Sequence, residues 1–261
     1  MQVAVNMPSE AVTDELKPEP SALDVRRLSH RIAGRAILDD IAVSIPAHGF
    51  AVLLGQNGAG KTTLFSLITR LYAAQQGSIH VFGHDLRKES SQALARIGAV
   101  FQQRAVDPDL TARQNLLYHA ALHGLSRRIA RQRIEEELTR VGLIKDADRK
   151  IRGFSGGESR RVEIVRALIH RPSLLLCDEA TVGLDVRRRA DILADVRGLV
   201  RDRGLTVLWA THLIDEVRPD DLTIILHRGR ILRQGRAKDI VASIGASGLN
   251  EAFRHITEAA A

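Results

Sequence analysis

Short apolar runs of strand length alternate with longer amphipathic segments along most of this chain. The strand-like runs lie at residues 21–28, 37–45, 50–54, 78–82, 97–101, 174–177, 205–210 and 222–226. Apolar residues at helical spacing predict helices over 60–71, 111–122, 127–141, 156–170 and 187–203. Strands that alternate with helices predict an α/β fold, with a mainly parallel sheet covered on both faces.

The pattern changes character at two places. Residues 1–21 carry Pro8, Pro18 and Pro20 among small and acidic residues, which predicts a flexible tail. From about residue 104 to 152 the spacing is helical throughout, which predicts a helical insertion. We therefore expect a tail (1–21), a first part of the core (22–102), a helical subdomain (103–152), a second part of the core (153–235) and a C-terminal helical tail (236–261).

The chain has 261 residues, of which 44% are hydrophobic and 26% are charged, as in an ordinary globular protein. This length allows one large domain or two small ones. No run of 18 apolar residues predicts a membrane span, and no basic and then apolar N-terminal segment predicts a secretory signal. The single cysteine, Cys177, excludes an internal disulfide and fits a reducing cytosol. Its place in an apolar run favours a buried, inert thiol over a reactive one.

The chain is basic, with a formal net charge of +7. Nucleic-acid binding and attraction to anionic lipid are two explanations of such a charge. A third is a solvated surface that favours arginine, since arginines are spread over 127–133, 160–161 and 187–189. Charge runs are usually solvated faces, so the third explanation is preferred.

A glycine-rich segment follows the run at 50–54 and precedes a predicted helix; it reads Gly55-Gln56-Asn57-Gly58-Ala59-Gly60-Lys61-Thr62-Thr63. It fits G-x-x-x-x-G-K-[ST], in which backbone N–H groups curl around phosphate oxygens. The next helix points its unpaired N–H groups at the same anion. Lys61 would reach the outer phosphates, and the Thr62 hydroxyl would ligate Mg²⁺. The alternative is a plain glycine turn beside a surface lysine, which the flanking strand and helix disfavour.

Two carboxylates end the apolar run Leu174–Cys177, namely Asp178 and Glu179. The carboxyl end of a buried parallel strand opens on the ligand crevice of an α/β sheet. Asp178 could hold Mg²⁺ there, and Glu179 could polarise an attacking water. One metal, one lysine and one base suffice for phosphoanhydride hydrolysis, which needs mainly positioning and charge neutralisation. An acidic helix start after a strand is the alternative, and the phosphate loop makes it the weaker one.

The segment Phe154-Ser155-Gly156-Gly157-Glu158 precedes Asp178 by one helix and one turn. Ser155 and Glu158 have the spacing of a capping box at the start of that helix. The segment also resembles the signature motif of ABC (ATP-binding cassette) ATPases, with Phe in place of the usual Leu and Glu in place of Gln. This resemblance implies that the helix end contacts the γ-phosphate of ATP bound to a partner subunit. Capping and phosphate contact are compatible, and we expect Glu158 to point back to the Ser155 backbone.

The resemblance implies roles for three further residues. Gln102 matches the Q-loop glutamine, which contacts Mg²⁺ and water. Asp185, in Gly183-Leu184-Asp185, resembles the D-loop residue at the dimer seam. His212, after the strand at 205–210, matches the switch histidine that contacts the γ-phosphate. The expected catalytic residues are Lys61, Gln102, Glu179 and His212, and the expected Mg²⁺ ligands are Thr62, Gln102 and Asp178.

The resemblance covers about residues 22–240. It implies a P-loop NTPase core with a mainly parallel sheet, an antiparallel β subdomain and an α-helical subdomain. Within the class, residues 107–115 and 181–185 look like the ATPases of ABC-2-type exporters, which move drugs, polysaccharides or lipids outward. To a lesser degree the chain resembles a subgroup associated with PQQ-dependent alcohol dehydrogenase systems.

A further position departs from the family pattern. Members usually place an aromatic residue before the second strand to stack on adenine, and the aligned residue here is Ile32. His30 lies two residues earlier, on the same face of an extended strand. Either an aliphatic contact replaces stacking, or His30 takes the role.

The preferred function is an ATPase subunit that drives an ABC transporter by ATP-dependent dimerisation. It implies ATP and Mg²⁺ as cofactors, a second nucleotide-binding subunit (a homodimer), a separate membrane permease and a place on the cytoplasmic face of the cell membrane. No nucleic-acid partner is expected. Two alternatives are a non-transport ABC ATPase acting on nucleic acid or the ribosome, which the basic charge allows, and an unrelated P-loop kinase or GTPase.

Overall fold

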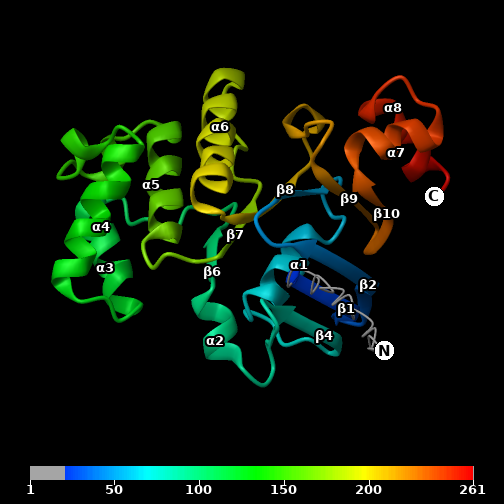
Figure 1. The fold of residues 1–261 in the computed structure, drawn as a ribbon, viewed down its shortest axis with the longest axis horizontal. Coiled ribbons are helices and arrows are strands. Elements are labelled where there is room, and N and C mark those ends of the chain that lie inside the picture. Colours follow the sequence, from blue (N-terminus) through cyan, green and yellow to red (C-terminus); the bar gives the residue numbers. More distant parts are fainter. Residues whose placement is uncertain (1–20, 261) are drawn as a thin grey trace, which may run out of the picture.

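A computed structural model describes residues 21–260 of the chain. The strands form two sheets, and helices cover them on several sides (Figure 1). Of the predicted N-terminal tail, residues 1–20 lie outside the described part, and Ser21 is the first residue of a strand. Within residues 21–260, no helix combines the length and apolar character needed to cross a bilayer.

The larger sheet is mainly parallel and forms the centre of the molecule. Its strand order is β10-β9-β3-β8-β7-β6, in which the β9–β10 pair is antiparallel. The bounds are β3 (Phe50–Leu54), β6 (Ile97–Val100), β7 (Leu174–Asp178), β8 (Thr206–Thr211), β9 (Leu222–His227) and β10 (Arg230–Arg236). Every residue of β7 and β8 is buried, as expected for parallel strands covered on both faces. The predicted α/β class is therefore confirmed.

Side chains of alternate parity along the parallel strands enter different cores. Leu174 and Leu176 of β7 pack toward α1 (Lys61–Ile68) and the smaller sheet. Leu175 and Cys177 pack instead with α5 (Gly156–Leu168) and α6 (Val186–Arg203). Cys177 is buried, as expected, and this burial raises the pKa of its thiol.

The smaller sheet is antiparallel, with the strand order β2-β1-β4-β5. Its strands are β1 (Ser21–Ile32), β2 (Arg35–Pro46), β4 (Gln76–Val81) and β5 (His84–Asp85), and α2 (Ser90–Ala95) follows them. Leu64, Phe65 and Ile68 of α1 are buried in one core with residues of both sheets. The phosphate-loop helix is thus held between two sheets, which fixes its N-terminus.

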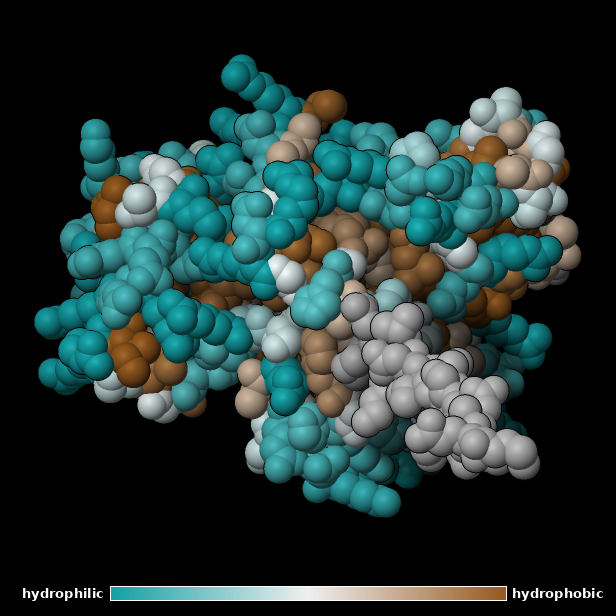
Figure 2. All heavy atoms as spheres, viewed as in Figure 1, coloured by the Kyte–Doolittle hydropathy of each residue, from teal (hydrophilic) through white to brown (hydrophobic). Residues whose placement is uncertain are grey.

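The helices α3 (Ala112–Leu122), α4 (Arg127–Arg140) and α5 form a helical unit at one end of the molecule (Figure 1). Leu116, Ile134, Leu138 and Val165 belong to its core, which is separate from those of the sheets. At the other end, α7 (Ala237–Ile244) and α8 (Leu249–Glu258) pack on β3 and β9 through a fourth core. The surface is mainly hydrophilic, and hydrophobic residues gather mostly along the middle of the face drawn in Figure 2.

Several predicted boundaries are wrong. The helix predicted over 60–71 ends at Ile68, since the Thr69 hydroxyl donates to the Phe65 carbonyl and Arg70 turns to a φ of 60°. The helix predicted over 156–170 ends at Leu168, and Arg171 takes a φ of 59° two residues after its C-cap Ile169. The pattern also missed β5, α2 and β10, which are short or lie at a sheet edge.

Candidate functional site

The glycine-rich segment lies between β3 and α1, at the carboxyl end of the parallel sheet. Gly60 is the N-cap of α1 with a φ of 111°, and no side chain caps this helix. A Cβ on Gly60 would lie 2.7 Å from Leu38 Cδ2 and 3.2 Å from the Ile37 carbonyl oxygen, and a side chain at this φ would strain the backbone. The first N–H groups of α1 therefore face a depression of about 330 Å³, where phosphate oxygens can accept from them.

Lys61 is held on the floor of this depression and is only 5% exposed. Its Nζ donates to the Gly55 carbonyl at 2.7 Å and to the Gln56 carbonyl at 3.1 Å. The same Nζ lies 3.1 Å from Glu179 Oε1. The lysine is thus aimed by its own loop, and the ion pair with Glu179 is the contact that an incoming phosphate would compete for.

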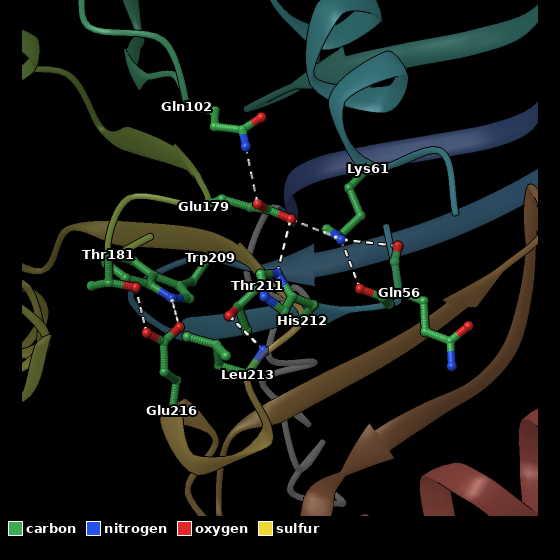
Figure 3. Close-up of polar contacts among 11 residues, drawn as sticks. Gln56, Lys61, Gln102, Glu179, Thr181, Trp209, Thr211, His212, Leu213 and Glu216 are labelled. Carbon is green, nitrogen blue, oxygen red and sulfur yellow. Dashed lines mark hydrogen bonds and ion pairs between the residues drawn. The ribbon is translucent and has the colours of Figure 1, made fainter. Parts of the chain in front are cut away.

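Glu179 is the point at which the predicted catalytic residues meet. Gln102 Nε2 lies 3.4 Å from its Oε2, and His212 Nδ1 lies 3.2 Å from its Oε1 (Figure 3). Glu179 is buried and has a φ of 48°, which costs a non-glycine residue roughly 1–3 kcal/mol. Its N–H donates to the Ala210 carbonyl of β8, and this bond holds the strained turn in place.

Asp178 is fully buried at the end of β7. Within residues 21–260, neither of its carboxylate oxygens has a hydrogen-bond partner of good geometry. Desolvation raises the pKa of Asp178, and the nearby Thr62 hydroxyl partly opposes this effect. A buried carboxylate without partners beside a hydroxyl is a suitable oxygen donor set for Mg²⁺. Asp178 and Thr62, two of the three residues predicted to hold the metal, therefore offer oxygen donors that suit it.

The signature segment lies at the N-terminus of α5 and carries a complete capping box. The Ser155 N–H donates to Glu158 Oε2 at 2.7 Å, and the Glu158 N–H lies 3.3 Å from Ser155 Oγ. The hydrogen bond from the Ser155 backbone is the main reason that the pKa of Glu158 is lowered. This confirms that Glu158 points back to the Ser155 backbone.

Within one chain the signature segment and the phosphate loop do not meet. Ser155, Gly157 and Glu158 line a depression shared with α6, whereas Lys61 and Glu179 line the other one. Asp185 is the N-cap of α6, where its side chain accepts from the Arg188 N–H at 3.0 Å. That bond lowers the pKa of Asp185.

Two buried residues of α5 hold the segment that carries Gln102, and sequence reasoning missed both. Arg160 Nη1 donates to the Phe101 carbonyl and to Glu163 Oε2, at 2.8 and 2.7 Å. Glu163 Oε1 accepts from the Ala105 N–H at 2.8 Å. Arg160 is only 7% exposed, so its assignment to a solvated arginine face is wrong. Its spacing of three from Glu163 is a signal for an ion pair, but it does not tell where the pair points.

Glu216 is a further residue that the sequence pattern did not reveal. It is buried and accepts hydrogen bonds from the Thr181 hydroxyl and from Trp209 Nε1 (Figure 3). Thr181 begins the segment that leads to Asp185, and Trp209 lies three residues before His212. Glu216 therefore links the segment after Glu179 to β8, through two residues that do not line the depression.

Two residues, His30 and Ile32, were candidates for contact with adenine, and they differ in exposure. His30 is buried and stacks on Tyr72, with ring centroids 5.8 Å apart and planes inclined by 9°. One face of its ring is therefore already covered. Ile32, at the end of the same strand, is 42% exposed. Of the two candidate residues, only Ile32 therefore exposes much of its side chain.

Comparison with known proteins gives the same family as the residues. The family model described as ABC transporter matches residues 38–182. The linearmycin resistance ATP-binding protein LnrL of Bacillus subtilis is 37% identical over 240 residues, which cover 88% of this chain and 77% of LnrL. The daunorubicin resistance ATP-binding protein DrrA3 of Streptomyces coeruleorubidus is 35% identical over 235 residues, which cover 90% of this chain and 74% of DrrA3.

A solved structure, described as the ATP binding subunit of an ABC transporter, has the same fold. It superposes with a TM-score of 0.80 at 26% identity and covers 91% of this chain and 100% of its own. Neither the unrelated P-loop kinase nor the non-transport ATPase is favoured by these matches. The chain belongs to the ABC transporter family, as an ATP-binding subunit whose ATPase activity is coupled to transport.

Proposed function

We propose that this chain is the ATPase of an ABC-2-type exporter, acting as a homodimer beside a separate permease at the cytoplasmic face of the cell membrane. The observation that carries the proposal is the convergence of Lys61, Gln102 and His212 on Glu179. Outward transport is supported by the segments 107–115 and 181–185 and by two relatives that are named for resistance to antibiotics.

Glu179 is proposed as the group that accepts a proton from water during hydrolysis. Phosphate oxygens of ATP would draw Lys61 away from Glu179, because they carry more negative charge than one carboxylate. The freed carboxylate then takes the water proton while the water oxygen bonds to the γ-phosphorus. The bond from that phosphorus to the bridging oxygen breaks, and ADP leaves. Gln102 orients the water, and His212 contacts the γ-phosphate oxygens.

Thr62, Gln102 and Asp178 would hold Mg²⁺ in this site. The ion supplies charge neutralisation on the phosphate oxygens when it is bound. The N–H groups of the loop Gly55–Thr63 orient the phosphates toward Lys61. At the other end of the nucleotide, the exposed side chain of Ile32 is proposed to contact adenine, which gives less base selectivity than aromatic stacking would.

The dimer is proposed because one chain provides only part of a site. The segment Ser155–Glu158 lies in a depression of its own, away from Lys61. In a head-to-tail pair, this helix end would reach the γ-phosphate bound by the partner, and Asp185 would lie at the seam. ATP then contacts both halves only in the closed state, so its binding favours closure.

The Glu179→Gln variant tests the role of Glu179. General-base catalysis contributes about 10²- to 10⁴-fold, so phosphate release should fall by that factor. ATP binding should persist, and the variant should accumulate as a closed dimer in size-exclusion chromatography with light scattering. Glu258→Gln, a change near the end of α8, serves as the control and should keep normal turnover. Normal turnover in Glu179→Gln itself would refute the assignment.

A further inference from the structure

Three histidines meet in a groove between the helical unit and the parallel sheet. His119 lies in the last turn of α3, His123 is the C-cap of that helix, and His170 follows the C-cap of α5. One ring nitrogen from each lies within 4.8 Å of the other two. The groove has a volume of about 280 Å³ and contains none of the residues assigned to the nucleotide. This three-histidine cluster therefore has no part in ATP hydrolysis as proposed above.

The hydrogen bonding of His170 fixes which nitrogen is free to bind. Its Nε2 lies 2.9 Å from the carbonyl oxygen of Ile97. Because a carbonyl oxygen only accepts, Nε2 carries the hydrogen and Nδ1 keeps its lone pair. That Nδ1 is buried and has no hydrogen-bond partner within residues 21–260. An imidazole whose N–H is bonded to a backbone carbonyl is the usual arrangement of a metal-binding histidine.

The other two histidines are four residues apart on one helix. This spacing places both rings on one face of α3, with centroids 4.6 Å apart. Pairs of histidines at this spacing bind zinc in metalloproteases. The rings of His123 and His170 are stacked, with centroids 3.9 Å apart and planes inclined by 7°. Two positions on a helix and one on the adjoining turn can thus supply three nitrogens to one ion.

The local field favours a cation at this place in one respect and opposes it in another. Helices α3 and α5 both end beside the three histidines, and the C-terminus of each helix carries roughly half a negative charge. Arg166 lines the same groove, and its positive charge opposes a bound cation. The neutral form of each imidazole is the one that binds a metal ion.

We propose that His119, His123 and His170 bind a divalent transition-metal ion of the Zn²⁺ class, leaving its fourth coordination position open to the groove. Imidazole nitrogens suit Zn²⁺ and its neighbours rather than Mg²⁺ or Ca²⁺. A Zn–N distance of about 2.0–2.1 Å in a tetrahedral site places ligand nitrogens about 3.4 Å apart. Bringing the nitrogens from within 4.8 Å of one another to this spacing needs shifts of about 1–1.5 Å. The exposed His123 ring would also have to rotate out of its stack on His170, so that its lone pair faces the ion.

A bound ion would join the helical unit to the core. His119 and His123 belong to α3, whereas His170 is bonded to Ile97, the first residue of β6. The strand β6 leads directly to Gln102. Metal binding would therefore stabilise the contact between α3 and the sheet edge that precedes the Gln102 segment, and the folded protein would gain thermal stability by mass action.

The test uses the full chain, untagged and free of nucleotide, so that neither a tag nor ATP binds the metal. Zn²⁺ binding is measured by isothermal titration calorimetry, and metal content after dialysis by mass spectrometry. We expect one Zn²⁺ per chain, a rise in melting temperature with Zn²⁺, and a visible absorption band of four-coordinate Co²⁺. His123→Gln is the mildest variant, since His123 is exposed, and His170→Gln removes the ligand with the fixed tautomer. Each should weaken Zn²⁺ binding at least tenfold.

The control is His255→Gln, since His255 is exposed on α8 and lies outside the cluster. It should bind Zn²⁺ within twofold of the unchanged chain. Equal binding by His123→Gln, His170→Gln and the unchanged chain would place the ion elsewhere and overturn the proposal. So would the absence of stoichiometric Zn²⁺. Neither result depends on ATP hydrolysis, so the proposed ATPase role stands or falls separately.

Discussion

The chain has two glycine-rich helix starts, at α1 and at α5, and they differ in how their N–H groups are satisfied. At α1 the N-cap is Gly60, and no side chain caps the helix. At α5, Ser155 and Glu158 cap each other's backbone in a complete capping box. The N–H groups at the start of α1 are left free to bind an anion held by the same chain. The N–H groups at the start of α5 are already partly bonded by side chains of that helix.

This difference indicates that the two helix ends bind phosphate under different conditions. An open helix end beside a buried lysine can bind phosphate in the monomer. A capped end keeps fewer free donors, so it binds phosphate well only where other groups already hold the nucleotide. The comparison therefore predicts that damage at α1 weakens ATP binding by one chain, while damage at α5 affects mainly the dimer.

The largest effect is expected at the open end, from Lys61→Ala. A hydrogen bond to a charged group contributes about 1.5–3 kcal/mol, so ATP should bind about 10- to 100-fold more weakly. Calorimetry with Mg²⁺ and ATP, at protein concentrations at which the chain is a monomer, measures this loss of affinity. Lys238→Ala is the control, because Lys238 forms an ion pair with Asp220 at the surface. This variant should bind ATP with unchanged affinity. Unchanged ATP affinity in Lys61→Ala would show that the open end does not hold phosphate.

A smaller and more selective effect is expected at the capped end, from Ser155→Ala. Loss of the N-cap costs about 1 kcal/mol, and the hydroxyl is no longer available to the partner's ATP. Monomer affinity for ATP should stay within twofold, while ATP-dependent dimerisation weakens by about tenfold. Ser126→Ala removes the N-cap of α4 in the same way and controls for lost helix stability. Equal losses in the two variants would mean that Ser155 acts only as a cap.

The third prediction tests the physical link between the two ends. Glu163 on α5 pairs with Arg160, and together they hold the backbone from Phe101 to Ala105. Glu163→Gln keeps the shape but removes the charge, so the Gln102 segment should be held less firmly. We expect turnover to fall several-fold at saturating ATP, with ATP affinity retained.

Glu137→Gln is the matched control for the third prediction, since Glu137 of α4 is also buried and pairs with Arg140 of the same helix and with Arg203 of α6. It should lose comparable stability and keep its turnover. If both variants lose the same turnover, the link is general stability rather than the position of Gln102.

Much of the parallel sheet could be predicted from the sequence, because buried strands are short apolar runs between turn residues. Leu174–Asp178 and Phe50–Leu54 were placed to within a residue for this reason. The capping box at Ser155 was also predictable, since it depends on residues only three apart. Local signals thus located the helix starts and strand ends on which the proposed site is built.

Features that depend on distant residues were not predictable in this way. His30 is covered by Tyr72, which lies on another segment, and no local pattern shows that contact. Arg160 appears among other charged residues in the sequence, yet the fold turns it inward to two carbonyl groups. The hairpin strand β10 was missed because its exposed edge position removes the alternation of apolar residues.

The smallest effect is expected from Glu158→Gln. Glutamine can still accept from the Ser155 N–H, so the capping box should persist. Because the side chain points back to Ser155, removing its charge should change ATP-dependent dimerisation by less than tenfold. The pKa of Glu158 lies below its ordinary 4.5 in the folded state, so its charge stabilises the fold above that pH. The difference in melting temperature between the two proteins should therefore shrink as the pH falls through the lowered pKa. A tenfold or larger gain in dimerisation would mean that the carboxylate faces the partner's phosphate after all.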